Sequence, residues 1–317
     1  MTSALSDFIG AHQQQIESAL RQNLPVSNKP GTARFNQALS YAVFPGGKRL
    51  RPIITLLAGR LVSADEQAAL GCACAIEFLH TSSLILDDLP GMDDADLRRN
   101  QTAVHLVFGE GLAVLAAVAL LNQAYAQFAA AARGQSAESA IENLLVEATN
   151  CVGANGMIGG QVVDLEFNAT AMDPEILAHR DAKTIALMRL MMTSNALATG
   201  ASSDDCAALR GFGELLGEAY QICDDLLDDL AASSLTGKTP GQDSRHWRLT
   251  AITELGHHDS YRRATSQFAK GETLLRSRFG NSFEVELLVE IGNSVIRGIE
   301  DLTELPEVSV GSSAGVP

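Results

Sequence analysis

Two long apolar segments with helical spacing do most to limit the folds that this chain can adopt. In residues 64–88, apolar side chains recur every three or four positions, and Asp65 stands where a helix N-cap is expected. Residues 109–132 are apolar on nearly all sides, as expected of a helix at the centre of a bundle. Alternating β-branched runs are rare, and short breakers with Gly or Pro separate the helical segments. These patterns predict an all-α, single-domain bundle of ten or more helices.

Composition limits the partners that the chain can have. Its 317 residues carry a formal net charge of −15, which argues against nucleic acid because phosphate binding needs a basic surface. We see no signal peptide, and no stretch reaches the roughly 20 apolar residues of a membrane span. The five scattered cysteines fit reduced thiols. We expect a cytoplasmic protein without a transmembrane segment, in which residues 1–305 form one domain and residues 306–317 a flexible tail.

Two clusters of aspartates end apolar segments, one within residues 87–96 and the other within residues 224–229. Asp224 and Asp228 are four positions apart, so they share one face of a helix, where like charges destabilise it. The ordinary explanation of an acidic cluster is a helix face exposed to solvent. That explanation is adequate for one such cluster and weaker when two of them end apolar segments. Carboxylate oxygens suit Mg²⁺ or Ca²⁺, and Mg²⁺ commonly shares its ligands with a substrate phosphate. The two clusters therefore favour a divalent cation site.

A helix-loop-helix calcium site is a poor alternative. Such a loop needs glycine at its sixth position and glutamate at its twelfth. Counted from Asp87, these positions hold Met92 and Arg98, and the register from Asp88 also lacks both residues.

Basic groups recur around the acidic clusters although the whole chain is acidic. In "FPGGKRLRP", the basic residues follow two glycines at the start of a predicted helix, where backbone N–H groups can approach an anion. An ordinary basic surface turn is the alternative. Arg98 and Arg99 directly follow the first cluster, and simple neutralisation of the neighbouring aspartates would also explain them. The combination indicates a diphosphate site built from metal ions and cations. The other polar groups in this set are Lys183, Thr184 and Lys238.

The chain resembles the trans-isoprenyl diphosphate synthases, the polyprenyl synthetase family, over residues 44–255. The resemblance rests on the order and spacing of "FPGGKRLRP", "EFLHTSSLILDDLPGMDDADLRR", "GMIGGQVVDLE", "DAKT", "YQICDDLLDD" and "GKTPGQD". The segments "SLILDD" and "AVLAAVALL" are especially similar to bacterial geranylgeranyl diphosphate synthases of carotenoid pathways. The resemblance implies an isoprenoid synthase fold with helices around a central cavity. It also implies a homodimer, for which the apolar segment "LAVLAAVALL" is a candidate interface element.

The resemblance also implies roles for individual residues. The ligands of three Mg²⁺ ions would be Asp87, Asp88, Asp93, Asp224, Asp225 and Asp228. The groups around the allylic diphosphate would be Arg98, Lys183, Thr184, Gln221 and Lys238. Isopentenyl diphosphate would be held by Lys48, Arg51, His80 and Arg99. The catalytic set would comprise the six aspartates with Lys183 and Thr184. A histidine on an apolar helix is more often a core residue, but His80 matches a position of the family.

The implied activity is a Mg²⁺-dependent head-to-tail (1′-4) condensation of isopentenyl diphosphate with dimethylallyl, geranyl or farnesyl diphosphate. Two positions depart from the family's pattern. "RRNQTAVH" replaces the common "RRGKPTxH", so we expect the loop after Arg99 to be less tightly turned. Arg248 stands where lysine is usual, which keeps the charge of a substrate-binding position and changes its donor geometry.

Product length depends on residues before Asp87, because in this family the product tail runs along the helix that ends there. Ser82 and Ser83 lie one turn below Asp87 and are small, whereas short-chain synthases often have an aromatic floor at this level. Phe78 lies about one turn deeper as a candidate stop. We predict geranylgeranyl diphosphate as the product and farnesyl diphosphate as the alternative.

Two other classes share parts of this pattern. A class I terpene cyclase is also all-α with an aspartate-rich motif, but it usually has an Asn/Ser/Glu second metal motif and needs no isopentenyl site. A non-catalytic subunit of a heteromeric prenyl synthase tends to lose acidic ligands, and this chain keeps both clusters.

Overall fold

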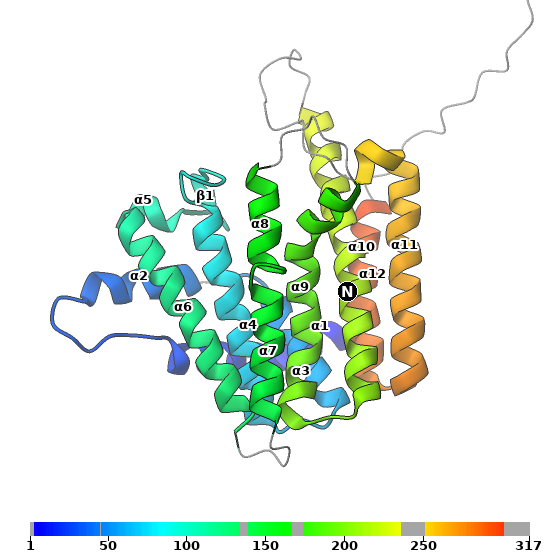
Figure 1. Cartoon of the computed structure of the whole chain (residues 1–317), viewed down its shortest axis with the longest axis horizontal. Helices are drawn as coiled ribbons and strands as arrows, with labels where there is room; N and C mark the ends of the chain where they lie inside the picture. The colour runs from blue at the N-terminus through cyan, green and yellow to red at the C-terminus, as the bar shows by residue number, and fades with distance from the viewer. Residues whose placement is uncertain (1–2, 45, 134–138, 167–173, 236–250, 301–317) are drawn as a thin grey trace, which may run out of the picture.

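A computed structural model describes residues 3–44, 46–133, 139–166, 174–235 and 251–300, and helices make up most of them (Figure 1). The first elements are α1 (Ser3–Asn23), α2 (Ala33–Val43), α3 (Leu50–Leu61), α4 (Glu66–Asp87), β1 (Leu97–Arg98), β2 (Gln101–Thr102) and α5 (Val104–Phe108). The later elements are α6 (Glu110–Ala131), α7 (Ala140–Val152), α8 (Met157–Glu166), α9 (Pro174–Thr199), α10 (Ser203–Leu235), α11 (Ala251–Phe279) and α12 (Phe283–Glu300). The prediction of an all-α bundle with ten or more helices is confirmed.

Helix α4 lies at the centre of the bundle and carries the first acidic cluster at its end. It contacts α1, α3, α6 and α9, and most of its residues from Ala68 onward are buried. The Asp65 carboxylate accepts hydrogen bonds from the backbone N–H groups of Gln67 and Ala68, at 3.0 and 3.2 Å. This is the N-cap that the sequence predicted, and it fixes where the helix begins.

Helix α6 lies at the side of the bundle, beside α4 and α7 (Figure 1). Its inner face packs against α4 through residues such as Ala117 and Leu120, whereas Leu115 is 57% exposed and Val118 53% exposed. The expectation of a helix at the centre of the bundle is therefore wrong for this segment. A helix that is apolar all round has the same sequence pattern whether its second face is covered by its own chain or is open.

Both α4 and α6 are long and apolar enough to cross a membrane by length and composition alone. The most apolar part of α4 is 72% buried inside the bundle, as in a core helix, whereas that of α6 is 33% buried. The absence of a transmembrane segment therefore stays a prediction.

Helices α9 and α10 approach closely because α10 has glycines on the contact face. A Cβ atom on Gly213 would lie 2.9 Å from the Cα atom of Arg189, and one on Gly217 would lie 2.8 Å from that of Ile185. Neither position leaves room for a side chain without moving the other helix. The close contact places Thr184 of α9 beside Gln221 of α10, which matters for the site.

Strands β1 and β2, of two residues each, form a hairpin after α4. Arg98 pairs with Gln101, so Arg99 and Asn100 form the turn, with φ of 53° and 61°. Among two-residue hairpin turns, type I′ has positive φ at both central residues, and asparagine tolerates this conformation better than most residues. The expectation of a looser loop after Arg99 is therefore wrong, since Asn100 supplies the conformation for which the family commonly uses glycine.

Candidate active site

The first acidic cluster forms where α4 ends and the chain folds back over its own helix end. Asp87 is the last residue of α4 and Asp88 is its C-cap. The backbone N–H of Asp93 donates to the carbonyl of Asp87 at 2.8 Å, and that of Ala95 donates to the carbonyl of Asp88 at 3.2 Å. These bonds satisfy carbonyls that the helix leaves open and return Asp93 to the vicinity of Asp87.

Lys183 of α9 lies against this cluster. Its Nζ atom is 2.8 Å from Asp87 Oδ2 and 2.5 Å from Gln161 Oε1 of α8. Burial raises the pKa of Asp87, while the ammonium of Lys183 acts in the opposite direction and nearby Asp93 raises it further. The ammonium thus lies between a carboxylate and an amide oxygen, a position from which it can also donate to a bound anion.

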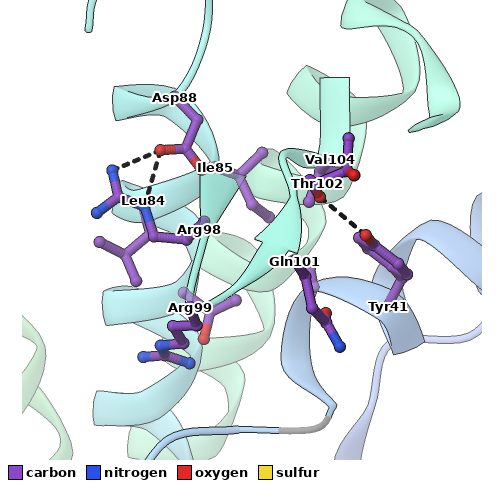
Figure 2. A pocket seen from close by; sticks show the side chains of 11 residues that line it. Tyr41, Leu84, Ile85, Asp88, Arg98, Arg99, Gln101, Thr102 and Val104 are labelled. Atoms are coloured by element: carbon purple, nitrogen blue, oxygen red, sulfur yellow. Dashed lines mark hydrogen bonds and ion pairs between the residues drawn. The ribbon is translucent and has the colours of Figure 1, made fainter. Parts of the chain in front are cut away.

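Arg98 lies against the neighbouring carboxylate. Its Nε and Nη2 atoms are 2.8 and 2.5 Å from Asp88 Oδ1, and Figure 2 shows the guanidinium turned toward Asp88 from the β1–β2 hairpin. The Asp88 side chain is 2% exposed and that of Arg98 37%. A short pair with a buried carboxylate fixes the hairpin against α4, and the exposed part of Arg98 faces outward.

A small cavity of about 40 Å³ lies between α2, α4 and the hairpin (Figure 2). Its lining includes Thr81, Asp88, Arg98 and Gln101. The hydroxyl of Thr81 is buried there without a hydrogen-bond partner among the described residues. The cavity has room for water and not for a prenyl chain. The larger central cavity implied by the family therefore stays a prediction.

The second acidic cluster lies on α10 and is linked to α9. Thr184 Oγ1 donates to Gln221 Oε1 at 2.8 Å, and Gln221 Nε2 donates to Asp225 Oδ1 at 3.1 Å. Since Lys183 and Thr184 are consecutive, one short piece of α9 contacts both the first cluster, through Asp87, and the second, through Gln221. The structure therefore brings together residues from three motifs that are far apart in the sequence.

A group of cations surrounds His80, which lies about two turns before Asp87 on the same face of α4. Burial lowers the pKa of His80 well below its usual value, and the charges of Arg51, Arg99, Arg98 and Lys183 lower it further. The imidazole is therefore neutral near pH 7 and acts as a hydrogen-bonding group rather than as a cation. The Nε atom of Arg51 is buried without a hydrogen-bond partner among the described residues. A buried N–H group without a partner is costly, and an anion bound beside it would supply the missing acceptor.

The residues predicted to set chain length lie at different positions around α4. Ser83 and His80 share the face of Asp87, by the three- and four-residue spacing of a helix. Ser83 is half-buried and its hydroxyl donates to the carbonyl of His80 at 2.9 Å. Ser82 is buried against α6, where its hydroxyl donates to the carbonyl of Ala117 at 2.9 Å. Phe78 is fully buried.

Some predicted site residues are exposed or lie outside the described part. Lys48 and Asp224 are exposed at the surface. Asp228 belongs to α10, but its side chain is not among those that the structure describes. Lys238 and Arg248 lie outside the described residues, as does the predicted tail of residues 306–317.

Sequence reasoning assigned no role to Gln161 or Glu77, and it grouped Arg49 with Lys48 and Arg51 as cations for a bound anion. Gln161 holds Lys183, while Arg49 and Glu77 form a buried ion pair below the cations near His80. Gln161 lies in "GMIGGQVVDLE", which carried part of the family resemblance, so that motif was the available signal. Nothing in the sequence distinguishes Arg49 from its basic neighbours.

The donors at both clusters fit a hard divalent cation. Asp93 lies close enough to Asp87 to raise the pKa of Asp87, after burial, and the groups of this cluster are carboxylate oxygens, which a hard divalent cation prefers. In the described residues no three His, Cys, Asp or Glu side chains form a preassembled cluster, and Asp87 and Asp88 are paired with Lys183 and Arg98 instead. Positive charge therefore already occupies the carboxylates that Mg²⁺ would use.

Comparison with known proteins identifies the family. The model of the polyprenyl synthetase family matches residues 32–286. Geranylgeranyl pyrophosphate synthase 9, chloroplastic, of Arabidopsis thaliana is 36% identical over 241 residues, which are 75% of this chain and 66% of that protein. Dimethylallyltranstransferase of Fischerella ambigua is 35% identical over 261 residues, which are 82% of this chain and 74% of that protein. The chain thus spans slightly less than two thirds of the plant relative.

The fold agrees with this assignment. A crystal structure of an FPP/GFPP synthase from Zymomonas mobilis superposes with a TM-score of 0.81 at 28% identity, covering 93% of this chain and 100% of that one. The all-α architecture, the ordered motifs and the matched residues agree with one another. The chain belongs to the polyprenyl synthetase family.

Proposed function

We propose that the protein catalyses the Mg²⁺-dependent head-to-tail (1′-4) condensation of isopentenyl diphosphate with an allylic diphosphate. The observation that carries the proposal is the pair of contacts made by consecutive residues, Lys183 with Asp87 and Thr184 with Gln221. These contacts join an acidic helix end, a second acidic helix and a cation at one place. A diphosphate with its metal ions needs those groups together.

The metal would be held by Asp87, Asp88 and Asp93 on one side and by Asp224, Asp225 and Asp228 on the other. Three ions are expected from the family. When bound, Mg²⁺ supplies positive charge that stabilises the departing diphosphate. Lys183 and Arg98 would add hydrogen bonds to the same diphosphate, because both already lie at the carboxylates of the first cluster.

The proposed reaction breaks the allylic C–O bond, forms a C–C bond and ends with the loss of a proton. The C1–O bond of the allylic substrate breaks, and the diphosphate leaves with the electron pair. The double bond of isopentenyl diphosphate attacks the allylic cation, which forms a new C–C bond. The resulting cation loses a proton, for which the released diphosphate is the proposed base. Apolar walls around the site keep water from the cation.

Isopentenyl diphosphate would be held by Lys48, Arg51, His80 and Arg99. His80 would contribute a hydrogen bond as a neutral imidazole, since burial and, after it, the surrounding cations lower its pKa. The unpaired Nε–H of Arg51 would find its acceptor in the diphosphate.

The preferred product is geranylgeranyl diphosphate, with farnesyl diphosphate as the alternative. The small side chain of Ser83, on the face of Asp87, supports a tail longer than fifteen carbons. Ser82 and Phe78, which the sequence also assigned to chain length, are buried on other faces of α4. A role in carotenoid biosynthesis and a cytoplasmic location are further predictions from the sequence.

We also propose a homodimer that covers the outer face of α6. The support is the exposed apolar surface on α6 and the neighbouring helices, which is unusual for a free surface of a soluble monomer. Its most exposed members, each more than half exposed, are Leu115, Val118, Val146, Ile158 and Val162.

One assay tests the proposed activity. Purified protein is incubated with Mg²⁺, isopentenyl diphosphate and each of dimethylallyl, geranyl and farnesyl diphosphate, and the products are identified by mass. Elongated prenyl diphosphates that depend on Mg²⁺ would support the proposal. Cyclic hydrocarbons would indicate a terpene cyclase, and no turnover with any primer would indicate a non-catalytic subunit.

A further inference from the structure

We propose that Glu77 and Arg49 are a buried positioning pair that holds the isopentenyl diphosphate site in shape without touching the substrate. The inference rests on the proposed function and extends it to two residues that neither the motifs nor the comparisons assign. It begins from the finding that "GGKRLRP" contains one basic residue that points inward.

The guanidinium of Arg49 is held by groups of the protein itself. Its Nε is 2.7 Å from Glu17 Oε1, its Nη1 is 2.5 Å from Glu77 Oε1, and its Nη2 donates to the carbonyl of Val43 at 2.8 Å. The residue is 3% exposed. Each of the three guanidinium nitrogens is used by α1, α4 or the end of α2, so Arg49 acts within the protein.

Glu77 connects this arginine to the site. Its side chain is 3% exposed, and the same Oε1 atom that pairs with Arg49 lies 3.9 Å from Arg99 Nη1. Glu77 is also one helical turn before His80. One buried carboxylate therefore lies beside two arginines and directly below the neutral imidazole.

The backbone around Arg49 depends on the pair. Arg49 adopts a left-handed conformation with φ of 53°, which a bulky residue rarely adopts without compensating contacts. A Cβ atom on Gly46 would lie 1.9 Å from the Cζ atom of Arg49, so the loop passes directly over the guanidinium. Lys48 directly precedes Arg49 and Arg51 follows two positions later, so we expect the conformation of Arg49 to set the directions of both.

Electrostatics gives the pair a second effect. Burial lowers the pKa of Arg99 most, Glu77 raises it, and Arg49, Arg51 and Arg98 lower it further. The carboxylate thus offsets repulsion among cations that must stay together to bind a diphosphate. Removing one member of a buried pair leaves the other charge unpaired, which displaces the groups nearby.

The test compares Glu77→Gln and Arg49→Lys with the wild-type protein. Binding of isopentenyl diphosphate is measured by calorimetry without Mg²⁺ or an allylic substrate, and KM is measured separately for isopentenyl diphosphate and for geranyl diphosphate. We expect about tenfold weaker binding and a similar rise in KM for isopentenyl diphosphate, with KM for geranyl diphosphate changed less than twofold. Equal changes in both KM values, or no change in either, would overturn the proposal.

Two further variants separate positioning from stability. In Arg49→Met with Glu77→Leu, apolar groups replace the buried charges, which is often neutral for stability. We expect this double variant to regain thermal stability while isopentenyl diphosphate binding stays weak. Glu147→Gln is the matched control, because Glu147 is 5% exposed and pairs with Arg189 and Arg210 away from this site. It should lose stability and bind isopentenyl diphosphate like wild type.

Recovery of binding in the double variant, or loss of binding in Glu147→Gln, would reduce the pair to a structural role. The calorimetry also separates this inference from the proposed reaction. A wild-type protein that binds isopentenyl diphosphate but makes no product would refute the reaction, and the variants would still decide the role of the pair. A wild-type protein that does not bind it would refute both.

Discussion

Lys183 Nζ lies 2.8 Å from Asp87 Oδ2, so an ammonium from α9 neutralises the acidic end of α4. The next residue, Thr184, contacts Gln221 of α10 at 2.8 Å. Together these contacts connect the two acidic clusters through a single peptide unit. An incoming metal–diphosphate would replace Lys183 at the carboxylate and offer the ammonium a phosphate oxygen in exchange.

Lys183→Met should therefore lower kcat/KM for the allylic diphosphate by about 10²- to 10³-fold, the usual effect of removing one preorganised charge from a transition state. Lys183→Arg should retain more activity because it keeps the charge. Steady-state kinetics with geranyl diphosphate measures both. Lys270→Met, on the exposed surface of α11, is the control. Equal rates for wild type and Lys183→Met would remove Lys183 from the site.

Gln161→Leu should raise KM for the allylic diphosphate about tenfold, by loss of one hydrogen bond to a charged group. The reason is that Gln161 Oε1 accepts from Lys183 at 2.5 Å and limits where the ammonium can point. KM for isopentenyl diphosphate should stay unchanged. Gln14→Leu, on the exposed part of α1, controls for the change of residue type. A similar rise for both substrates would argue against orientation of Lys183.

Ser83→Phe should shorten the product, whereas Ser82→Phe should mainly destabilise the protein. Ser83 shares the face of Asp87 and is half-buried, but Ser82 is buried with its hydroxyl on the carbonyl of Ala117. A phenyl ring at Ser82 has to displace α6, and overpacking of this kind costs about 1–3 kcal/mol. Product mass and thermal unfolding separate the two effects. Unchanged product lengths in a stable Ser83→Phe variant would exclude Ser83 from the tail path.

His80 should affect stability in acid. In the folded protein its pKa is lowered by burial and then by the charges of Arg51, Arg99, Arg98 and Lys183. The unfolded chain therefore binds a proton near pH 6.5, whereas His80 in the folded protein stays unprotonated at that pH. Wild type should therefore lose stability relative to His80→Gln as the pH falls below about 6.5, by at most about 1.4 kcal/mol per pH unit. Urea unfolding of both proteins at several pH values measures this. If the difference in free energy of unfolding between the two proteins stays constant from pH 7.5 to 5.5, the pKa of His80 is not lowered in the folded protein.

Leu115→Glu should convert the proposed dimer to a monomer. Leu115 is 57% exposed on α6, and a charge buried in an apolar interface without a partner is strongly unfavourable. Light scattering after size exclusion gives the mass of each form. Val26→Glu is the control, because Val26 is equally apolar and 54% exposed but lies in the segment between α1 and α2. A monomeric wild-type protein would refute the interface.

Much of the site could be predicted from sequence because its residues lie in short motifs with local geometry. The N-cap at Asp65, the acidic end of α4 and the assignment of Lys183, Thr184 and Gln221 to one diphosphate all depend on spacing within a helix or on ordered motifs. The structure places these last three residues within one set of contacts with Asp87 and Asp225.

Other features depended on contacts between distant segments. Arg49 and Arg51 are equivalent in a one-dimensional pattern, and only Glu17 and Glu77 decide which of them is buried. The position of α6 at the side of the bundle could not be read from its composition, since an apolar residue such as Leu115 does not indicate what covers it. The tight turn at Asn100 was missed because asparagine and glycine were treated as different when both accept positive φ.

The contact between Gly46 and Arg49 also constrains how this loop can change during evolution or directed mutagenesis. A methyl group at Gly46 would lie 1.9 Å from the Arg49 Cζ atom, so alanine is acceptable there only after Arg49 has been replaced. Replacing Arg49 first leaves Glu17 and Glu77 without their partner. Each of the two substitutions is therefore unfavourable when made alone. A library of single variants will show Gly46 and Arg49 as two intolerant positions and will not show that the two positions are coupled.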